Sequence, residues 1–532
     1  MSTFDSRPVL TRRALLGSAA ATGLAALVPA PVTARTRTLG YPFTLGVASG
    51  DPTSDAVVLW TRLAPRPLDR DGGMPARPVE VYWEIATDPH LRTVVQRGVC
   101  AARPELGHSV HVEPRGLGAH REYWYRFRVD GHLSEIGRTR TLPAPGSSPS
   151  ALRFAVACCQ NYQTGYYTAY RSLAAERPDL VLFLGDYIYE YPPRGDRDVR
   201  PLLGGEPVDL AGYRARYAQY RADPDLRAAH AAAPFGTVWD DHEVKNDYAG
   251  PVPQPSSDPD VVAAFGARRA AAYQAFYEHV PMRRPAGATD FSTLRVYQRL
   301  RVGELATINL LDTRQYRSDQ PCDDGTGHGN LKIDDTCAER DDPARTILGA
   351  QQRAWLLDGL ARSDTRWNLI AQQMLFAELR MAEEQNPGRL VMEADGWDGY
   401  TADRRLILDH LRSRSVSNPV VFSGDIHDHA VADLPADFAD PTARVVATEF
   451  VAGAISSPSF GTTTGAADHN PHLRFGSERN GYLSVRLTPE RMETEVRSMY
   501  PPEGVRYVTP DAECRTEARF VVLDGRPGAQ PG

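Results

Sequence analysis

The segment LVLFLGDYIY at residues 180–189 sets a pattern that recurs along the chain. Five apolar residues typical of a buried β-strand end at a glycine, and Asp186 follows at once. A strand-like run also precedes Cys159, the acidic run 239–243 and the run GDIHDH at 424–429. The carboxyl ends of parallel strands meet at one edge of a sheet, where their side chains can converge. These segments predict an α/β domain with an acidic, histidine-containing site at its sheet edge.

The chain of 532 residues is too long for one typical hydrophobic core, so we expect more than one domain. Residues 40–142 alternate apolar and polar positions in short runs, which predicts a small all-β sandwich of the fibronectin or immunoglobulin type. A Pro/Gly/Ser-rich linker at 143–150 separates it from the α/β domain, expected over 151–510. Residues 511–532 are expected to be a C-terminal tail with a frayed, Gly/Pro-rich end.

The alternation of apolar runs and helical patterns places the elements of the α/β domain. The expected strands include 152–158, 180–184, 304–311, 366–374, 419–423 and 444–451, and the expected helices include 209–221, 261–278, 349–361 and 402–413. Residues 190–235 form either a helical flap over the site or an ordinary pair of surface helices.

The first 34 residues have the features of an export signal. Paired arginines at 12–13 precede an apolar stretch at 14–28, and Val32-Thr33-Ala34 is a plausible cleavage site. We interpret residues 1–34 as a twin-arginine signal peptide, which predicts export to the periplasm, the cell wall or the medium. A disordered arm is the alternative. No segment has the length and composition of a transmembrane helix.

The charge of the chain restricts the classes of partner. A formal net charge of −7 argues against a general nucleic-acid binder, which would carry a basic surface. An acidic protein that handles phosphate needs local positive charge, and metal ions can supply it.

Six cysteines suggest disulfides in an exported chain. Cys322 and Cys337 bracket a polar loop and are the best candidate pair. Cys158 and Cys159 are adjacent at a strand end, so their side chains should point to opposite faces. One can lie in the core while the other faces the site.

One set of candidate ligands contains four kinds of donor. Cys159, Asp186, Tyr189 and His427 offer a thiolate, a carboxylate, a phenolate and an imidazole. Phenolate ligation favours a hard, highly charged ion, so this set suits ferric iron better than magnesium or calcium.

A second set offers oxygen atoms alone. Asp241 and Asp425 could share a further ion with Asp186, and Asn246 could add an amide oxygen. Oxygen ligands favour calcium, magnesium or manganese over zinc. Taken singly, each motif could instead be a helix cap, a solvated turn or a core thiol. It is their succession at strand ends that favours a metal site.

The ordered motifs resemble those of PhoD-type alkaline phosphatases in the metallophosphoesterase superfamily, over about residues 40–510. The matching motifs are Cys159-Gln160, Gly185-Asp186-x-x-Tyr189, Trp239-Asp240-Asp241-His242-Glu243-Val244, Asp312-Thr313-Arg314-Gln315-Tyr316-Arg317, Trp397-Asp398-Gly399-Tyr400 and Gly424-Asp425-Ile426-His427. Cys159, Asp241 and Asp425 stand where the related purple acid phosphatases have an aspartate, an asparagine and a histidine.

The resemblance implies a catalytic domain with the α/β/β/α sandwich of metallophosphoesterases. It implies ferric iron held by Cys159, Asp186, Tyr189 and His427. It also implies calcium at Asp186, Asp241 and Asp425 with Asn246 as a weaker candidate; zinc or manganese is less favoured. A second calcium ion is our hypothesis from the charge count, because it would leave positive charge to bind a phosphate.

Catalytic roles are carried over in the same way. His242 would contact phosphate or assist proton transfer, and Gln373 would take the place of a strand-end histidine, with Gln372 as its rival. Arg314 and Arg317 would contact phosphate or form buried ion pairs.

The expected function is hydrolysis of phosphomonoesters and phosphodiesters by a metal-activated hydroxide or oxide, without a protein nucleophile. The substrates would be small phosphate esters, phospholipids or teichoic-type diesters, and the enzyme a monomer. The alternatives are a phospholipase D acting on phospholipid diesters and a glycan-binding protein with a defunct catalytic domain. Trp397 and Tyr400 could form an apolar lip for lipid, or belong to the core.

Overall fold

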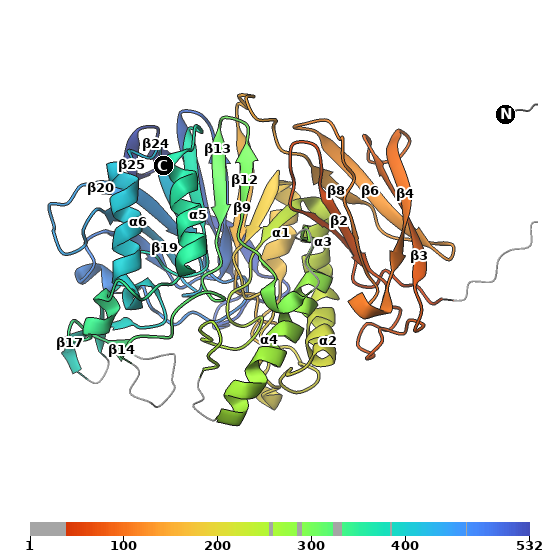
Figure 1. Ribbon diagram of the computed structural model, residues 1–532, viewed down its shortest axis with the longest axis horizontal. Helices are drawn as coiled ribbons and strands as arrows, with labels where there is room; N and C mark the ends of the chain where they lie inside the picture. Colours follow the sequence, from red (N-terminus) through yellow and green to blue (C-terminus); the bar gives the residue numbers. More distant parts are fainter. Residues whose placement is uncertain (1–38, 255–258, 285–289, 323–331, 384–385, 464) are drawn as a thin grey trace, which may run out of the picture. The chain divides into compact units, whose positions relative to one another are not determined.

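The computed structural model describes residues 39–254, 259–284, 290–322, 332–383, 386–463 and 465–532. The expected signal peptide, 1–34, lies outside these residues. Within them the strands form four sheets, accompanied by α-helices and short 3-10 helices, so the chain has a mixed α/β fold (Figure 1). No described helix has the length and apolar character needed to span a bilayer.

The largest sheet has ten strands, and β9, β10, β11 and β1 are parallel neighbours within it. In sheet order its strands are β25 (Arg526–Pro531), β24 (Glu513–Leu523), β23 (Arg491–Tyr500), β22 (Gly481–Leu487), β9 (Leu152–Ala157), β10 (Leu180–Phe183), β11 (Pro234–Thr237), β1 (Val47–Gly50), β2 (Val58–Arg62) and β5 (Ser109–Val112). All four residues of β10 are buried, as expected for a strand covered on both faces.

A second sheet has seven strands, of which β13, β15, β18 and β20 are parallel neighbours. In sheet order these are β12 (Gln298–Val302), β13 (Ala306–Leu310), β15 (Trp367–Ala371), β18 (Pro419–Ser423), β20 (Val445–Val451), β19 (His429–Pro435) and β21 (Leu473–Ser477). The six strands expected from the sequence are confirmed as β9, β10, β13, β15, β18 and β20.

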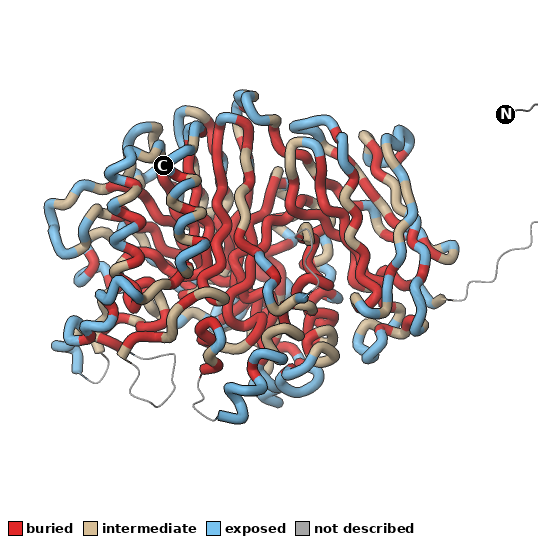
Figure 2. The backbone as a smooth tube through the Cα atoms, in the orientation of Figure 1, coloured by how far each residue is buried: buried red, intermediate tan, exposed pale blue. Residues whose placement is uncertain are grey.

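The two large sheets share one hydrophobic cluster. The ring of Phe154 in β9 contacts the ring of Phe422 in β18 edge-on, with centroids 5.5 Å apart. A second cluster joins the seven-stranded sheet to α5 and α6, for example through Leu356 and Ile407. Figure 2 shows the strands of both sheets largely buried and exposed residues on these two helices.

The helices expected from the sequence are confirmed within two residues at each end. The α-helices are α1 (Thr168–Glu176), α2 (Leu210–Arg221), α3 (Pro224–Ala232), α4 (Pro259–His279), α5 (Gly349–Ala361) and α6 (Thr401–Ser413). The 3-10 helices are η1 (Pro104–Leu106), η2 (Gly195–Arg197), η3 (Phe291–Thr293), η4 (Ala338–Asp341), η5 (Trp397–Gly399) and η6 (Ala466–Asp468). Among the α-helices, α1 lies outside the expected ranges, and α3 falls in the segment 190–235, for which a pair of helices was one alternative.

The strands of residues 40–142 are divided between two sheets. A five-stranded sheet contains β4 (Val94–Ala102), β3 (Val79–Ala86), β6 (Glu122–Val129), β7 (His132–Leu133) and β8 (Gly137–Arg140). The other three, β1, β2 and β5, lie at the end of the ten-stranded sheet because β1 pairs with β11. A common core that includes Leu59, Ile85 and Phe127 joins the two sets. The alternating pattern predicted the strands correctly but not this continuity with the large sheet.

The expected C-terminal tail, 511–532, is wrong, because residues 513–531 form β24 and β25. β24 pairs with β23 along its length, and its Phe520 and Val522 are buried. β25 is an edge strand, where a proline such as Pro531 removes no ladder hydrogen bond.

The predicted disulfide between Cys322 and Cys337 is confirmed. Cys337 packs with Ile333 and Met392 beside a small sheet. That sheet consists of β14 (Lys332–Ile333), β17 (Asn386–Glu393) and β16 (Met381–Glu383).

Candidate metal centre

Five candidate residues follow the carboxyl ends of parallel strands. Cys159 follows β9, Asp186 follows β10 and Asp241 follows β11. Asp425 and His427 follow β18 in the other sheet. Since the two sheets pack against each other, these exits from both sheets meet.

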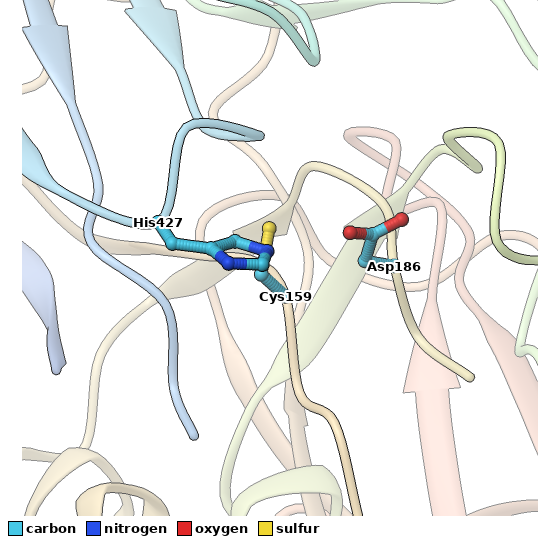
Figure 3. A group of neighbouring side chains, drawn as sticks. All are labelled: Cys159, Asp186 and His427. Atoms are coloured by element: carbon cyan, nitrogen blue, oxygen red, sulfur yellow. The ribbon is translucent and has the colours of Figure 1, made fainter. Parts of the chain in front are cut away.

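The side chains gather into three overlapping groups, within each of which the ligand atoms lie within 4.8 Å of one another. The groups are Cys159–Asp186–His427, Asp186–Asp241–His242 and Asp240–Asp241–Asp425. Figure 3 shows the first group, with Cys159 between His427 and Asp186 in this view. Because Asp186 and Asp241 each belong to two groups, the donors form a continuous set.

Four of these residues have a left-handed backbone. The φ angles of Cys159, Asp186, Asp425 and His427 are 56°, 59°, 67° and 61°. Residues other than glycine rarely adopt positive φ, and such residues cluster at functional sites, where the surrounding structure enforces them. The local backbone is therefore arranged around the donors at some conformational cost.

Two glycines allow close approach at the strand exits. A Cβ atom on Gly185 would lie 2.5 Å from the Cβ of Asp240, and Gly185 has φ of +104°. A Cβ atom on Gly424 would lie 2.5 Å from Sγ of Cys158. Each glycine therefore lets an acidic turn sit directly against a neighbouring strand end.

Tyr189 lies between the donors of the first group. Its hydroxyl donates to Oδ2 of Asp186 at 2.7 Å and lies 3.0 Å from Nε2 of His427. Ser457 donates to the same hydroxyl at 2.8 Å. The other ring nitrogen of His427, Nδ1, lies 2.8 Å from the carbonyl oxygen of Pro458. That contact orients the ring so that Nε2 faces the group, as in histidines that ligate metals.

The donor set fits a metal ion on two counts. Asp186 Oδ1 is buried and has no hydrogen-bond partner among the described residues. Burial raises the pKa of Asp186 well above its usual range, and the nearby carboxylates of Asp241 and Asp240 raise it further. A bound cation would satisfy the free oxygen and stabilise the ionised carboxylates.

Arg314 lies among these acids. Its Nε is 2.5 Å from Oδ1 of Asp240, and its Nη1 is 2.7 Å from Oδ2 of Asp395. Its Nη2 lies 3.7 Å from Asp241 and 3.4 Å from Asp425. Of the two roles left open by the sequence, the structure favours the buried ion pair. One guanidinium faces four carboxylates, so negative charge remains for cations to balance.

His242 is held by a buried carboxylate. Its Nδ1 lies 2.7 Å from Oε2 of Glu190, and its ring packs on that of Tyr189 with centroids 4.1 Å apart. Burial lowers the pKa of His242, but the carboxylates of Glu190, Asp186 and Asp241 outweigh it and raise that pKa well above its usual range. His242 can therefore hold a proton beside the candidate metal ligands.

Comparison with known proteins assigns the chain to a family. The family model for PhoD-like phosphatase matches residues 154–496, and the model for the N-terminal domain of PhoD-like phosphatases matches residues 29–143. The chain belongs to the PhoD-like phosphatase family. Alkaline phosphatase D of Bacillus subtilis (strain 168) is 43% identical over 498 residues, which are 92% of this chain and 82% of that protein. The chain is thus a phosphoesterase.

Solved structures agree with the family. A structure of PhoD superposes with a TM-score of 0.85 and 42% identity, covering 92% of each chain. The purple acid phosphatase PPD1 from yellow lupin (Lupinus luteus) shares the fold, with a TM-score of 0.53 and 13% identity over 91% of this chain and 74% of that one.

Two predicted site residues of this PhoD-like phosphatase have their side chains engaged elsewhere. The amide oxygen of Asn246 accepts a hydrogen bond from Tyr191 at 2.8 Å. The amide of Gln373 accepts from Thr313 Oγ1 at 2.7 Å and donates to the Leu311 carbonyl at 2.9 Å. The structure thus places Gln373 as a brace between the ends of β13 and β15, which speaks against the catalytic role expected for it.

Further residues that the sequence singled out near the site have structural roles in this chain. Gln372, the rival of Gln373, bonds to Ser423 and Trp397. Trp397 and Tyr400 are buried, so the core alternative is confirmed and the lipid lip is wrong. Arg317 pairs with Asp395 at 3.1 Å, which favours its ion-pair alternative.

Cys158 and His429 lie close to proposed iron ligands in the sequence, but both are outside the three donor groups. Cys158 is buried with its Sγ 3.5 Å from the carbonyl oxygen of Ala452, and it belongs to none of the three donor groups. His429 is the first residue of β19, and its Nδ1 accepts a hydrogen bond from Gly453 N at 2.8 Å.

Sequence reasoning missed three residues that hold the site together. Glu243 accepts hydrogen bonds from the backbone N–H groups of Tyr187 at 2.7 Å, Asp240 at 2.9 Å and Asp186 at 3.2 Å. The other two are Glu190, which binds His242, and Ser457, which binds Tyr189. Glu243 lies within a recognised motif and Glu190 directly follows one, whereas nothing in the sequence around Ser457 marks it.

Helices α2 and α3 occupy the segment for which a flap was one alternative. Tyr220 of α2 accepts a hydrogen bond from Tyr189 N at 3.1 Å and is fully buried. Arg216 of α2 donates to the Tyr191 carbonyl at 3.0 Å. These contacts show that α2 is packed against the turn carrying Tyr189 and holds it.

Proposed function

We propose that this PhoD-like phosphatase hydrolyses phosphomonoesters and phosphodiesters at a mixed centre of ferric iron and calcium. The observation that carries the proposal is the orphaned Oδ1 of Asp186, buried between two groups of donors. Such an oxygen is costly unless a cation binds it.

The proposed iron ligands are Cys159, Asp186, Tyr189 and His427. Their support is chemical, because a thiol, a phenol and an imidazole beside one carboxylate suit ferric iron better than calcium or magnesium. Tyr189 and His427 are within hydrogen-bond distance of each other at 3.0 Å, so both can turn to one point.

The proposed calcium ligands are the carboxylates of Asp186, Asp241 and Asp425, with two calcium ions expected. The support is the excess of acids around Arg314 and the absence of sulfur in this group. Asn246 remains the weaker candidate, because its amide oxygen already binds Tyr191. Zinc would fit this oxygen-rich set less well, and it is the family resemblance that favours calcium over manganese.

Bound ions would provide an acidic water as the nucleophile and would stabilise charge on the phosphoryl oxygens. The chain supplies the rest. His242, held by Glu190, can donate its proton to the leaving oxygen, because nearby carboxylates favour its protonated form. Arg314 keeps Asp240 and Asp395 in place.

Phospholipase D activity on phospholipid diesters is the alternative, and the burial of Trp397 and Tyr400 removes the apolar lip expected for it. Rates on phosphatidylcholine, bis-p-nitrophenyl phosphate and p-nitrophenyl phosphate would separate the two activities. Larger diesters of the teichoic type belong to the same substrate class.

The expected organisation of the chain is part of the proposal. We propose twin-arginine export directed by residues 1–34, an N-terminal β-sandwich at 40–142 and an α/β/β/α catalytic sandwich that begins at 151 and includes β24 and β25, in a monomeric enzyme. Two shared cores support the layering, one between the large sheets and one beneath α5 and α6.

The test is metal analysis of the purified protein together with its visible spectrum and activity. We expect about one iron and up to two calcium ions per chain, and an absorption band from thiolate and phenolate bound to ferric iron. Chelation should abolish hydrolysis, and calcium should restore it to protein that has kept its iron. A colourless protein containing zinc alone, or full activity after complete removal of metal, would contradict the proposal.

A further inference from the structure

Five aromatic rings form a row through the candidate metal centre. Phe460 stacks on His427 with centroids 4.6 Å apart and an interplanar angle of 19°. His427 is followed by Tyr189 at 6.4 Å, His242 at 4.1 Å and Tyr191 at 5.0 Å. Three of the rings are thus proposed site groups, and the outer two are not.

The two ends of this row differ from its middle in exposure. His427, Tyr189 and His242 are buried, whereas Phe460 is 70% exposed and Tyr191 is 39% exposed. The row therefore reaches solvent at both ends. A ligand bound over the centre would have an exposed aromatic ring on either side.

The carboxylate of Asp428 accepts hydrogen bonds from residues on both sides of Phe460. Asp428 Oδ1 accepts from Ser459 Oγ at 2.5 Å, and Oδ2 accepts from Thr463 N at 3.0 Å. Gly461 N also donates to Ser459 Oγ at 2.8 Å. Phe460 is thus fixed in its exposed position, and little conformational entropy would be lost when a ligand packs on it.

Tyr191 is fixed as well. Its hydroxyl donates to Asn246 Oδ1 at 2.8 Å, and its carbonyl accepts from Arg216 at 3.0 Å. Asn246 in turn donates its backbone N–H to Glu190, the partner of His242. Both exposed rings are therefore built into the networks that position the two histidines.

We propose that Phe460 and Tyr191 are specificity-determining residues that bind the organic groups esterified to the phosphate. Each ring packs against a planar or apolar face of such a group, one on each side of the centre. Aryl esters and esters with apolar chains are therefore preferred over esters of small polar alcohols. The inference rests on the proposed function, because it places the phosphate at the metal centre between the rings.

The experiment compares kcat/KM for phenyl phosphate and ethyl phosphate in wild type, Phe460→Ala and Tyr191→Ala. The measured quantity is kcat/KM for phenyl phosphate divided by kcat/KM for ethyl phosphate. Loss of metal or of folded protein lowers both values alike and leaves this ratio unchanged. We expect this ratio to fall about 3- to 10-fold when a ring that contacts the leaving group is replaced by alanine. A change of this size corresponds to the loss of one aromatic contact. With bis-p-nitrophenyl phosphate, both variants should lose activity.

Controls separate the ring from its surroundings. Phe460→Tyr keeps the ring and should keep the ratio, while Tyr82→Ala removes a tyrosine 43% exposed on β3 and should change nothing. Equal ratios in wild type and both alanine variants would overturn the inference, even if both esters were hydrolysed more slowly.

A binding measurement covers the case in which the proposed function itself fails. If wild type hydrolyses neither ester, the affinities for phenylphosphonate and methylphosphonate decide instead. Stronger binding of phenylphosphonate that disappears in both alanine variants supports the aromatic contact, and equal affinities refute it.

Discussion

The carboxylate of Glu190 lies 2.7 Å from Nδ1 of His242, and both side chains are almost fully buried. Glu190 follows directly after Tyr189, so one short turn carries a candidate metal ligand and the partner of the proposed proton donor. Its other oxygen accepts from Asn246 N at 2.8 Å, which ties the turn to the loop after His242.

Replacement of Glu190 should impair catalysis without unfolding the protein. Glu190→Gln removes the negative charge that favours the protonated form of His242, so we expect kcat/KM to fall about 10- to 100-fold. Bound metal should stay constant by elemental analysis. Glu206→Gln, at a more exposed glutamate of the same segment, is the matched control and should retain activity. An unchanged rate in Glu190→Gln would remove His242 from the mechanism.

The adjacent cysteines provide a matched pair for the metal assignment. Cys159→Ala should lower the iron content and weaken the visible band, because Cys159 belongs to the first donor group. Cys158→Ala should keep both, because Cys158 contacts the Ala452 carbonyl and belongs to none of the donor groups. Equal iron content in the two variants would show that Cys159 is no ligand.

Gly185 should tolerate no side chain. Gly185→Ala combines positive φ with a Cβ contact of 2.5 Å to Asp240, so we expect destabilisation by more than about 3 kcal/mol. Gly195 also has positive φ, but a Cβ atom there would meet no atom of the described residues within 4 Å, so Gly195→Ala should cost only about 1 kcal/mol. Urea unfolding of both variants measures the difference, and similar losses would mean that conformation alone decides.

A buried glutamate outside the site predicts a pH dependence of stability. Burial raises the pKa of Glu449 from 4.5 to about 7, although Ser423, Phe376 and Ala377 donate hydrogen bonds to its carboxylate. The folded state therefore binds an extra proton between these values, and stability should fall as the pH rises through this window. The full effect is about 3 kcal/mol.

Glu449→Gln should flatten the pH profile of the free energy of unfolding between about pH 4.5 and 7. The exposed Glu490→Gln should leave that profile as in wild type. If the free energy of unfolding of the wild type rose with pH over this range, and neither variant lost stability over it, Glu449 would be ionised in the folded protein without penalty.

The strand exits could be located from the sequence because their pattern is local. Runs such as 180–184 are apolar throughout, and a glycine followed by an acid ends them, so the candidate ligands follow directly. The same reasoning could not assign Glu190, whose role depends on a histidine brought close by folding. Phe460 carries no signal at all, since exposure and stacking on His427 are properties of the tertiary structure.

Strand partners were also beyond the sequence. The alternation in residues 40–142 predicts strands but does not say that β1 pairs with β11, far away in the chain. Glycine and proline near the C-terminus argued against strands, yet an edge position tolerates both. Side-chain pattern gives the face of a strand, whereas pairing depends on which edges remain free.

The pairing of β1 with β11 has a consequence for any attempt to shorten the enzyme. Deleting residues 40–142 would leave β11 with unpaired amide and carbonyl groups along one side, close to the turn that carries Asp241. An unpaired sheet edge of this kind promotes association between molecules. The amino-terminal strands thus protect this sheet edge of the catalytic domain, and a truncated enzyme should precipitate rather than be active.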